Sequence, residues 1–550
     1  MVQRTSTYSS TRFQGGSLQE SFSFEDVVLK GLASDGGLFH PNAIPQVQDS
    51  YLDWKDLRFD EVAFNIMRVF IDPSEISDTD LRSICGRSYS TFRETSVTPL
   101  VTLSQTANLH LLELFHGPTF AFKDVALQFL GNLFEYFLTR KNKDVASDGS
   151  PRHHLTVVGA TSGDTGSAAI YGLRNKKDVS IFIMFPTGKV SPVQELQMTT
   201  VLDPNVHCLS VAGTFDNCQD YVKQLFADPE ANRLHRLGAV NSINWARILA
   251  QITYYFTSYF QLLKAKPDLN KVKYVVPTGN FGDILAGYYA KQMGLPVSRL
   301  VIATNENDIL HRFWQTGTYS KQSNTEQEET KEDSVRETHS PAMDILVSSN
   351  FERLLWHLSL EHETDVNPGE TAETHIKNAG AKIAGWFQQL KTTGSFTVEP
   401  EILAKARALF TTYRVSDEET IEQIRSAYRG ESIENKGYVL DPHSAIGVAA
   451  ALREIKASSS SSSSPADPVI SLATAHPAKF ADAVELALKN EPDFTFQSVL
   501  PPQFVGLETQ DKKVIVVPAT AGLAQIRDLI TTEVDKEKQE REQQGKNGRA

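Results

Sequence analysis

Cysteine is scarce in this chain of 550 residues, with only Cys85, Cys208 and Cys218, far apart in the sequence. An odd number of widely spaced cysteines does not make a disulfide framework, and without a CxxC pair the usual ligands of structural zinc are missing. We therefore expect free thiols, a reducing compartment and no metal site.

The sequence also lacks long apolar runs and any excess of positive charge. No stretch approaches the 18 or so apolar residues of a spanning helix, and MVQRTSTYSS has no apolar signal-peptide core. Lys and Arg number 54 against 67 Asp and Glu, which gives a formal net charge of -13 and makes nucleic acid and anionic membranes unexpected partners. We expect a cytoplasmic protein; a transit peptide is the alternative, because the residues before Glu20 hold arginine and no acid.

What the chain does have, from Thr98 onward, is an alternation of strand and helix patterns. The apolar runs LHLLELF, LTVVGA, VSIFIMFP, KYVVP and VIATN end at turns and alternate with helical patterns. Such alternation is typical of βαβ units. We predict an α/β protein with helices around mostly parallel sheets, and ligand sites at the carboxyl ends of the strands.

Lys123 is the first candidate for chemistry, in the segment HGPTFAFKD. The turn at Pro118 and Thr119 and the helical spacing after it place Lys123 in the first turn of a helix. The helix dipole and the flanking aromatic rings favour the neutral amine there, which is a nucleophile. The alternative is that Lys123 only extends to the surface.

Two strand-loop-helix segments are candidate anion sites. In ATSGDTG, the hydroxyls of Thr161, Ser162 and Thr165 and the backbone amides lie at a helix start, although capping by Asp164 or Thr165 explains the same pattern. In PTGNFGD, glycines allow close approach to a ligand and the helix start offers N–H donors. Together with a reactive lysine, these loops suit a phosphorylated cofactor that carries an aldehyde.

The segments HGPTFAFKD, GATSGDTGSAA and PTGNFGD, in this order, resemble the threonine synthase family of fungi and many bacteria, which uses pyridoxal 5'-phosphate. The resemblance extends over most of the chain, through YSSTR, ASDGGLFHP, NSINWARILAQITYYF, SPAMDI, SSNFERLLW and LATAHPAKF. It implies the fold type II architecture of pyridoxal-phosphate enzymes: a large and a small domain, each with a mostly parallel sheet flanked by helices, plus an N-terminal domain.

The resemblance also implies roles for individual residues. Lys123 forms the Schiff base with the cofactor and later moves protons, and Thr474 offers its hydroxyl to the pyridine nitrogen. The cofactor phosphate is bound by Gly279, Asn280, Phe281, Gly282 and Asp283. The substrate is bound by Thr161, Ser162, Gly163 and Thr165 at its carboxylate, with Asp164 near the ring, and by Asn244 and Arg247 at its phosphate. For Arg247, a surface ion pair on its helix is the alternative.

The implied reaction converts O-phospho-L-homoserine and water to L-threonine and phosphate, the last step of threonine biosynthesis, by a carbon-oxygen lyase. Two other functions stay open: a serine or threonine dehydratase-like lyase on the same scaffold, and a non-catalytic binding protein of the same fold. We expect a monomer or homodimer.

The expected organisation has an N-terminal domain, a small domain inserted in a large one, two polar insertions and a frayed, charged tail. The expected ranges are 1–97 for the N-terminal domain, 98–150 and 246–532 for the large domain, 151–245 for the small substrate-binding domain, 317–340 and 456–467 for the surface insertions, and 533–550 for the tail. Asn350, Glu352 and Arg353 are interpreted as a helix cap and a helix face.

Overall fold

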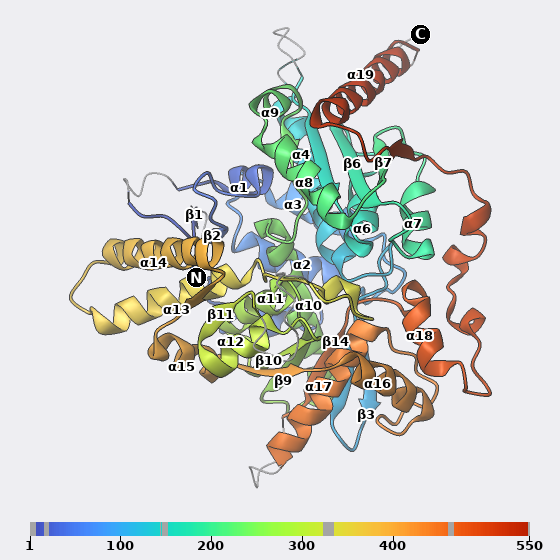
Figure 1. Cartoon of the computed structure of the whole chain (residues 1–550). Coiled ribbons are helices and arrows are strands. Elements are labelled where there is room, and N and C mark those ends of the chain that lie inside the picture. Colours follow the sequence, from blue (N-terminus) through green and yellow to red (C-terminus); the bar gives the residue numbers. More distant parts are fainter. Residues whose placement is uncertain are drawn as a thin grey trace. The chain divides into compact units, whose positions relative to one another are not determined.

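The computed structural model describes residues 7–15, 21–143, 145, 152–322, 335–459 and 467–547. The chain forms two compact units, whose elements are labelled in Figure 1. Unit 1 comprises Met1–Val27, Gly31–Phe122 and Ser242–Leu500, and unit 2 comprises Val28–Lys30, Lys123–Asn241 and Pro501–Ala550.

Unit 1 contains a six-stranded sheet. Its strands are β3 (Leu100–Ser104), β4 (Leu109–Glu113), β9 (Val272–Pro277), β10 (Val297–Thr304), β13 (Phe410–Arg414) and β14 (Val469–Ala473). They lie in the order β13-β10-β9-β14-β4-β3, and all neighbours are parallel except β3 and β4. This confirms the mostly parallel sheet predicted from the apolar runs.

Helices cover both faces of this sheet. Those of unit 1 are α2 (Phe59–Arg68), α3 (Asp78–Tyr89), α10 (Trp245–Ala265), α11 (Gly282–Gln292), α12 (Ile309–Thr316), α13 (Phe351–Val366), α14 (Ala372–Thr393), α15 (Pro400–Leu409), α16 (Asp417–Arg429), α17 (Pro442–Ser459) and α18 (Ala481–Leu488). Val275 and Val301 face the core formed with α16, α17 and α18. Because successive strand residues alternate in direction, Tyr274 faces the other side, where its ring contacts Tyr255 of α10.

The N-terminal part of unit 1 contains a short antiparallel pair, β1 (Tyr8–Ser10) and β2 (Phe39–Pro41), with α1 (Phe24–Lys30) between them in the chain. Tyr8 is fully buried and donates its hydroxyl to Phe70 O at 2.6 Å. Its ring also lies against Trp245, the first residue of α10. The N-terminal segment therefore packs beside the start of α10, next to two of the predicted substrate residues.

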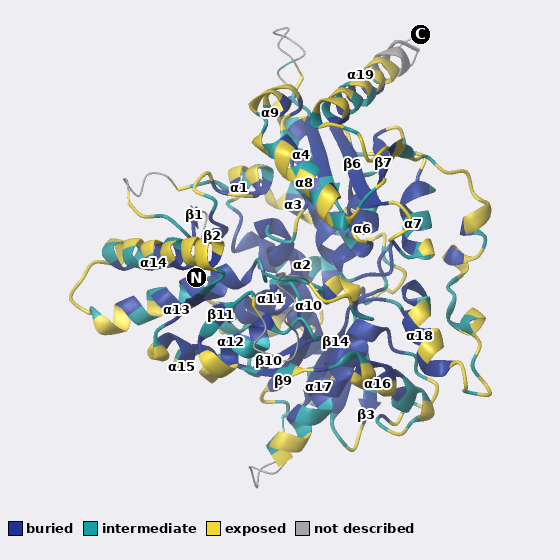
Figure 2. Cartoon of the chain, in the orientation of Figure 1, coloured by how far each residue is buried: buried dark blue, intermediate teal, exposed yellow. Residues whose placement is uncertain are grey.

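Unit 2 is built around a five-stranded sheet that is parallel throughout. Its elements are α4 (Lys123–Lys141), β5 (Leu155–Ala160), α6 (Asp164–Leu173), β6 (Val179–Pro186), α7 (Pro192–Thr199), β7 (Val206–Val211), α8 (Phe215–Ala227), α9 (Pro229–His235), β8 (Leu237–Gly238), β15 (Ile515–Val517) and α19 (Leu523–Asn547). The strand order is β15-β7-β6-β5-β8. Figure 2 shows β6 and β7 buried along their whole length, as continuous apolar runs of a two-sided parallel sheet should be.

The two units divide the chain at other places than the domain boundaries expected from the sequence. Helix α4, expected in the large domain, belongs to unit 2, where Gly131 lies against Gly172 of α6. Residues 501–550, also expected outside the small domain, contribute β15 and α19 to unit 2. The boundaries differ because close helix packing and strand pairing join segments that are distant in sequence.

The polar insertions are partly built into unit 1. Residues 323–334 and 460–466 lie outside the described residues. At the ends of the first insertion, however, Tyr319 and Ser340 are fully buried, and β11 (Thr318–Ser320) pairs with β12 (Ser395–Thr397). The expectation of a surface loop over 317–340 is therefore wrong at both ends of this range.

The expected frayed tail is also corrected, because α19 continues to Asn547. Glu537 is buried, and it accepts hydrogen bonds from Ser180 Oγ at 2.7 Å and His207 Nε2 at 2.8 Å. A buried carboxylate anchors the helix where the apolar pattern has stopped, so hydropathy alone did not reveal it.

The three cysteines are free thiols, as expected, and the structure shows that all three are buried. Burial raises the pKa of Cys208 to about 12 and that of Cys218 to about 11, so both stay protonated thiols near neutral pH. Among the described residues, no helix is both long and apolar enough to span a membrane.

Candidate active site

Lys123 is the first residue of α4, which confirms its predicted place at a helix start. The chain turns sharply before it, with Phe120 in the left-handed region at φ +60°. Phe122, its neighbour in sequence, donates its backbone N–H to Thr474 O at 2.8 Å. Lys123 is only 9% exposed, so it does not extend into solvent.

Thr474 directly follows the carboxyl end of β14. Its side chain is nearly buried, and its hydroxyl makes no hydrogen bond with any residue that the structure describes. The hydroxyl is therefore available to a ligand, and a hydrogen bond to a ring nitrogen is the role that the resemblance implies for it.

The GNFG loop, Gly279 to Gly282, connects β9 to α11 and leaves hydrogen-bond donors, but not acceptors, available. Its carbonyl oxygens at Gly279 and Asn280 accept hydrogen bonds, from Ser348 Oγ at 2.7 Å and from Asn350. Its four backbone N–H groups, in contrast, have no partner within the described chain. A set of unused N–H donors at the start of a helix is an anion site, so the loop fits a cofactor phosphate.

The loop is held in shape by apolar packing. Phe281 adopts φ +63° and is 1% exposed, and its ring contacts Trp314 and Phe351. At Gly279, a Cβ atom would lie 3.2 Å from both Ala342 O and Met343 Cα, so a side chain there would require this backbone segment to shift by a few tenths of an ångström.

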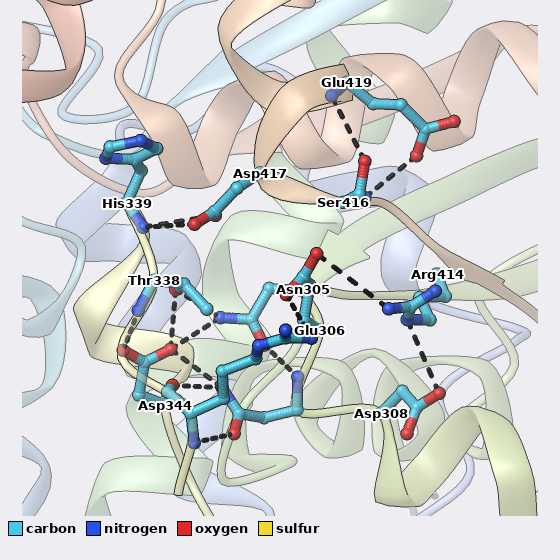
Figure 3. Close-up of polar contacts among 12 residues, drawn as sticks. Asn305, Glu306, Asp308, Thr338, His339, Asp344, Arg414, Ser416, Asp417 and Glu419 are labelled. Carbon is cyan, nitrogen blue, oxygen red and sulfur yellow. Dashed lines mark hydrogen bonds and ion pairs between the residues drawn. The ribbon is translucent and has the colours of Figure 1, made fainter. Parts of the chain in front are cut away.

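The segment that backs Gly279 is fixed by a polar network around Asp344 (Figure 3). Asn305, directly after β10, donates to Asp344 Oδ1 at 2.7 Å and to Ser340 Oγ at 2.9 Å. Thr338 donates to Asp344 from its hydroxyl at 2.6 Å and from its backbone N–H at 2.9 Å. These hydrogen bonds fix the end of the polar insertion beside the GNFG loop.

The side chain of Asp283 has a structural role, beside the phosphate contact that the resemblance implies for this residue. Its carboxylate accepts hydrogen bonds from Tyr254 at 2.6 Å and Tyr255 at 3.0 Å, both on α10. Burial raises its pKa to about 6. Its side chain thus joins α11 to α10, and only its backbone N–H remains for a phosphate.

In the ATSGDTG loop of unit 2, Thr161 organises the loop itself. Its hydroxyl donates to Gly163 O at 3.0 Å and accepts from Gly163 N and Gly166 N at 3.0 and 2.9 Å. Its backbone N–H donates to Met184 O. Its hydroxyl and its backbone N–H are therefore engaged within the protein, so we describe Thr161 as a positioning residue of this loop.

The remaining residues of this loop surround Gln194, which sequence reasoning missed. Gln194 Nε2 donates to Asp164 Oδ1 at 2.7 Å, and a Cβ atom at Gly163, whose φ is +151°, would overlap the Gln194 side chain. Ser162 is exposed and Thr165 half-buried. Neither hydroxyl has a hydrogen-bond partner in the described part of the chain, which leaves both able to bind a carboxylate. In the sequence, the only pattern that marks Gln194 is SPVQ, which indicates a helix start but no contact with Asp164.

Asn244 and Arg247 lie at the start of α10. Asn244 is its N-cap and accepts from Ala246 N at 3.1 Å. Arg247 is 4% exposed, which rules out the surface ion pair considered as an alternative. Burial lowers its pKa to about 10, so it still carries its charge near neutral pH.

Asn350 and Arg353 do more than cap a helix, which corrects the interpretation drawn from the sequence. Asn350 occupies the N-cap position of α13, yet its side chain makes no capping hydrogen bond. It donates instead to the phosphate loop, at Asn280 O. Its residue type gave a misleading signal, because asparagine is also a preferred cap.

Models of three protein families match this chain. These are "Threonine synthase N terminus" over residues 7–89, "Pyridoxal-phosphate dependent enzyme" over 91–356, and "Threonine synthase, C-terminal" over 444–530. The second match spans Lys123 and both anion loops, so pyridoxal phosphate is the cofactor of this fold.

Curated relatives and solved structures agree with these matches. Threonine synthase of Schizosaccharomyces pombe is 55% identical, over 92% of this chain and 95% of that protein. The Saccharomyces cerevisiae enzyme is 53% identical, over 98% and 100%.

A crystal structure of the yeast enzyme covers 97% of this chain and 99% of its own, with a TM-score of 0.87 at 52% identity. One of pyridoxal-phosphate-bound threonine synthase from Brucella melitensis has a TM-score of 0.80 at 40% identity, covering 96% and 99%. The chain belongs to the threonine synthase family of pyridoxal-phosphate-dependent lyases, with the fold type II architecture that its sequence predicted.

Proposed function

We propose that this protein converts O-phospho-L-homoserine and water to L-threonine and phosphate. The observation that carries the proposal is the GNFG loop, whose carbonyls are occupied while its N–H groups at Gly279, Asn280, Phe281 and Gly282 have no partner among the described residues. Family membership supports the reaction, and the loop supports the phosphorylated cofactor that it needs.

Lys123 is the residue that binds the cofactor aldehyde in this proposal. Its Nζ then takes the proton from the substrate α-carbon and returns it later in the reaction. Pyridoxal phosphate, when bound, supplies the electron sink for the negative charge that develops on the substrate. The Thr474 hydroxyl binds the pyridine nitrogen; being neutral, it leaves that nitrogen largely unprotonated.

The substrate carboxylate is bound by Ser162, Gly163 and Thr165, whose positions are set by Thr161. Asp164 lies near the reacting part of the substrate and is oriented by Gln194. The substrate phosphate binds Arg247, because a buried guanidinium offers paired donors to phosphate oxygens, and Asn244 assists it.

The deciding experiment incubates the protein with pyridoxal phosphate and O-phospho-L-homoserine and measures threonine, 2-oxobutyrate and free phosphate together. Equal amounts of threonine and phosphate support the proposal. Dominant 2-oxobutyrate favours the dehydratase-like lyase, and no product at all favours a binding protein.

Arg247→Ala separates the two enzymes further. A synthase should lose its affinity for the phosphorylated substrate, whereas the activity of a dehydratase on serine or threonine should not change.

The cytoplasmic location and the monomeric or homodimeric state also belong to this proposal. Size-exclusion chromatography with light scattering tests the oligomeric state.

A further inference from the structure

Asn350 connects two segments of unit 1 that the proposed function assigns to two different phosphate groups. Its Nδ2 donates to Asn280 O at 3.0 Å, in the cofactor phosphate loop, and to Ser242 O at 3.2 Å, just before the N-cap of α10. Its backbone N–H also donates to Asn280 O, at 3.0 Å. One amide group thereby spans from the GNFG loop to the segment that carries Asn244 and Arg247.

Arg353, one turn along α13, fixes the orientation of that amide. Its guanidinium donates to Asn350 Oδ1, which forces the NH₂ end of the amide toward the two carbonyls. It donates also to Ile243 O at 2.6 Å and to Phe39 O at 2.8 Å. Arg353 is fully buried, so its charge is balanced by these oxygen acceptors and not by bulk water.

Glu352 fastens the same helix end to the N-terminal segment. It accepts hydrogen bonds from Thr11 Oγ1 at 2.5 Å and from Arg12 at 2.9 and 2.7 Å. The first turn of α13 is therefore tied at three places: the N-terminal segment, the loop before α10 and the phosphate loop. A turn held in this way cannot move without breaking several buried hydrogen bonds.

We propose that Asn350 is a positioning residue that holds the GNFG loop and the start of α10 at a fixed separation. The cofactor and the phosphorylated substrate would then bind at a fixed distance from each other. The inference rests on the proposed function for its substrate half. Its cofactor half requires only that the GNFG loop binds a phosphate.

Asn350→Asp is the sharpest test, because it keeps the size of the side chain and an oxygen for Arg353. The NH₂ group becomes an oxygen that faces the carbonyls of Asn280 and Ser242, so both hydrogen bonds are lost. Pyridoxal phosphate titrated into the apoprotein, followed by absorbance, should bind about tenfold more weakly or worse. The KM for O-phospho-L-homoserine should rise as well.

Thr371→Ala is the matched control, because Thr371 is a true N-cap that accepts from Thr374 N at 3.2 Å on the neighbouring helix α14. It should lower the urea midpoint slightly and leave cofactor affinity unchanged. Asn350→Asp with wild-type cofactor affinity at an unchanged urea midpoint overturns the proposal. Should this variant fail to fold, Arg353→Lys serves instead, because it removes the planar fork that orients the amide; unchanged cofactor affinity in that variant overturns the proposal too.

Failure of the proposed function gives a different result. A wild-type protein that makes no threonine and phosphate refutes that function, while the cofactor titration of Asn350→Asp still decides the role of Asn350 at the loop. A raised cofactor dissociation constant with an unchanged KM refutes the coupling to α10.

Discussion

At the scale of single residues, several buried polar side chains near the candidate site form hydrogen bonds with neighbouring groups of the protein. Thr161 uses its hydroxyl three times inside its own loop, and Asp283 binds two tyrosines. Groups without such a partner among the described residues remain available to a ligand: the N–H donors of the GNFG loop and the hydroxyls of Thr474, Ser162 and Thr165.

Lys123→Arg should abolish activity, because arginine keeps the positive charge but neither bonds to the cofactor aldehyde nor moves protons near neutral pH. We expect kcat to fall about a thousandfold or more. Borohydride treatment followed by mass spectrometry should show the cofactor fixed to the wild-type chain and not to the variant. The exposed Lys189 provides the control, and Lys189→Ala should behave as wild type.

The pKa of Asp283 predicts a specific pH dependence of stability. Burial raises it from 3.8 to about 6, so between these values the folded state binds a proton that the unfolded state has lost. Stability from this group is therefore fully present below pH 3.8 and is lost as the pH rises to about 6, by roughly 3 kcal/mol. Asp283→Asn should remove this loss.

The measurement is the free energy of unfolding in urea from pH 4 to pH 7. The difference between Asp283→Asn and wild type should grow with pH over this range. A difference that stays constant would show that Asp283 is ionised in the folded protein at all of these values.

Residue roles were partly predictable from the sequence. The turn at Pro118 placed Lys123 at a helix start, and the strand-loop-helix patterns predicted the loops that precede α6 and α11. Such patterns do not predict which group a side chain contacts. Asparagine is a common helix cap and threonine a common ligand, yet Asn350 and Thr161 form hydrogen bonds with nearby loops. Which neighbour takes each hydrogen bond depends on tertiary packing.

At the scale of elements, α4 and α6 approach so closely that only glycine fits between them. A Cβ atom on Gly131 would overlap the carbonyl of Gly172, and one on Gly172 would lie 2.5 Å from Leu127 O. Gly131→Ala should therefore lower the free energy of unfolding by about 1–3 kcal/mol. Thermal or urea unfolding measures this loss.

Gly385→Ala is the opposite case on α14. Its Cβ would meet nothing within 4 Å, so the change should stabilise the helix by about 0.5–1 kcal/mol. Equal effects of both substitutions would contradict the close packing of α4 on α6.

The last helix should also prove structural. Glu537→Ala removes the carboxylate that accepts from the buried Ser180 and His207, so it should destabilise the protein by about 1–3 kcal/mol. Lys538→Ala, which affects only an exposed pair with Asp535, should have no measurable effect. If limited proteolysis removes α19 equally fast in both variants, Glu537 is not its anchor.

Strands and helices of the βαβ part were well predicted, because long apolar runs and helical periodicity are local signals. The runs LTVVGA and VSIFIMFP are β5 and β6, and the helix after FKD is α4. Helix α19 and strand β11 were not predicted, since each depends on a partner far away in the chain.

At the scale of the whole molecule, both units are assembled from separated segments. Unit 1 is interrupted by residues 123–241, and unit 2 by residues 242–500. The sequence predicted that the small domain interrupts the large one, but it did not predict that residues 501–550 return to the small one, because the pairing of β15 with β7 leaves no local pattern. The family resemblance, carried by short motifs spread along the chain, was less sensitive to this interleaving.

The late arrival of β15 has a consequence for synthesis on the ribosome. Strands β5, β6 and β7 emerge early, but the partner of β7 follows only after residues 242–500 have been made, on the order of tens of seconds later. During that interval the nascent chain carries an open sheet edge, which invites aggregation and chaperone binding. The sheet of unit 2 can be completed only after β15 has left the ribosome.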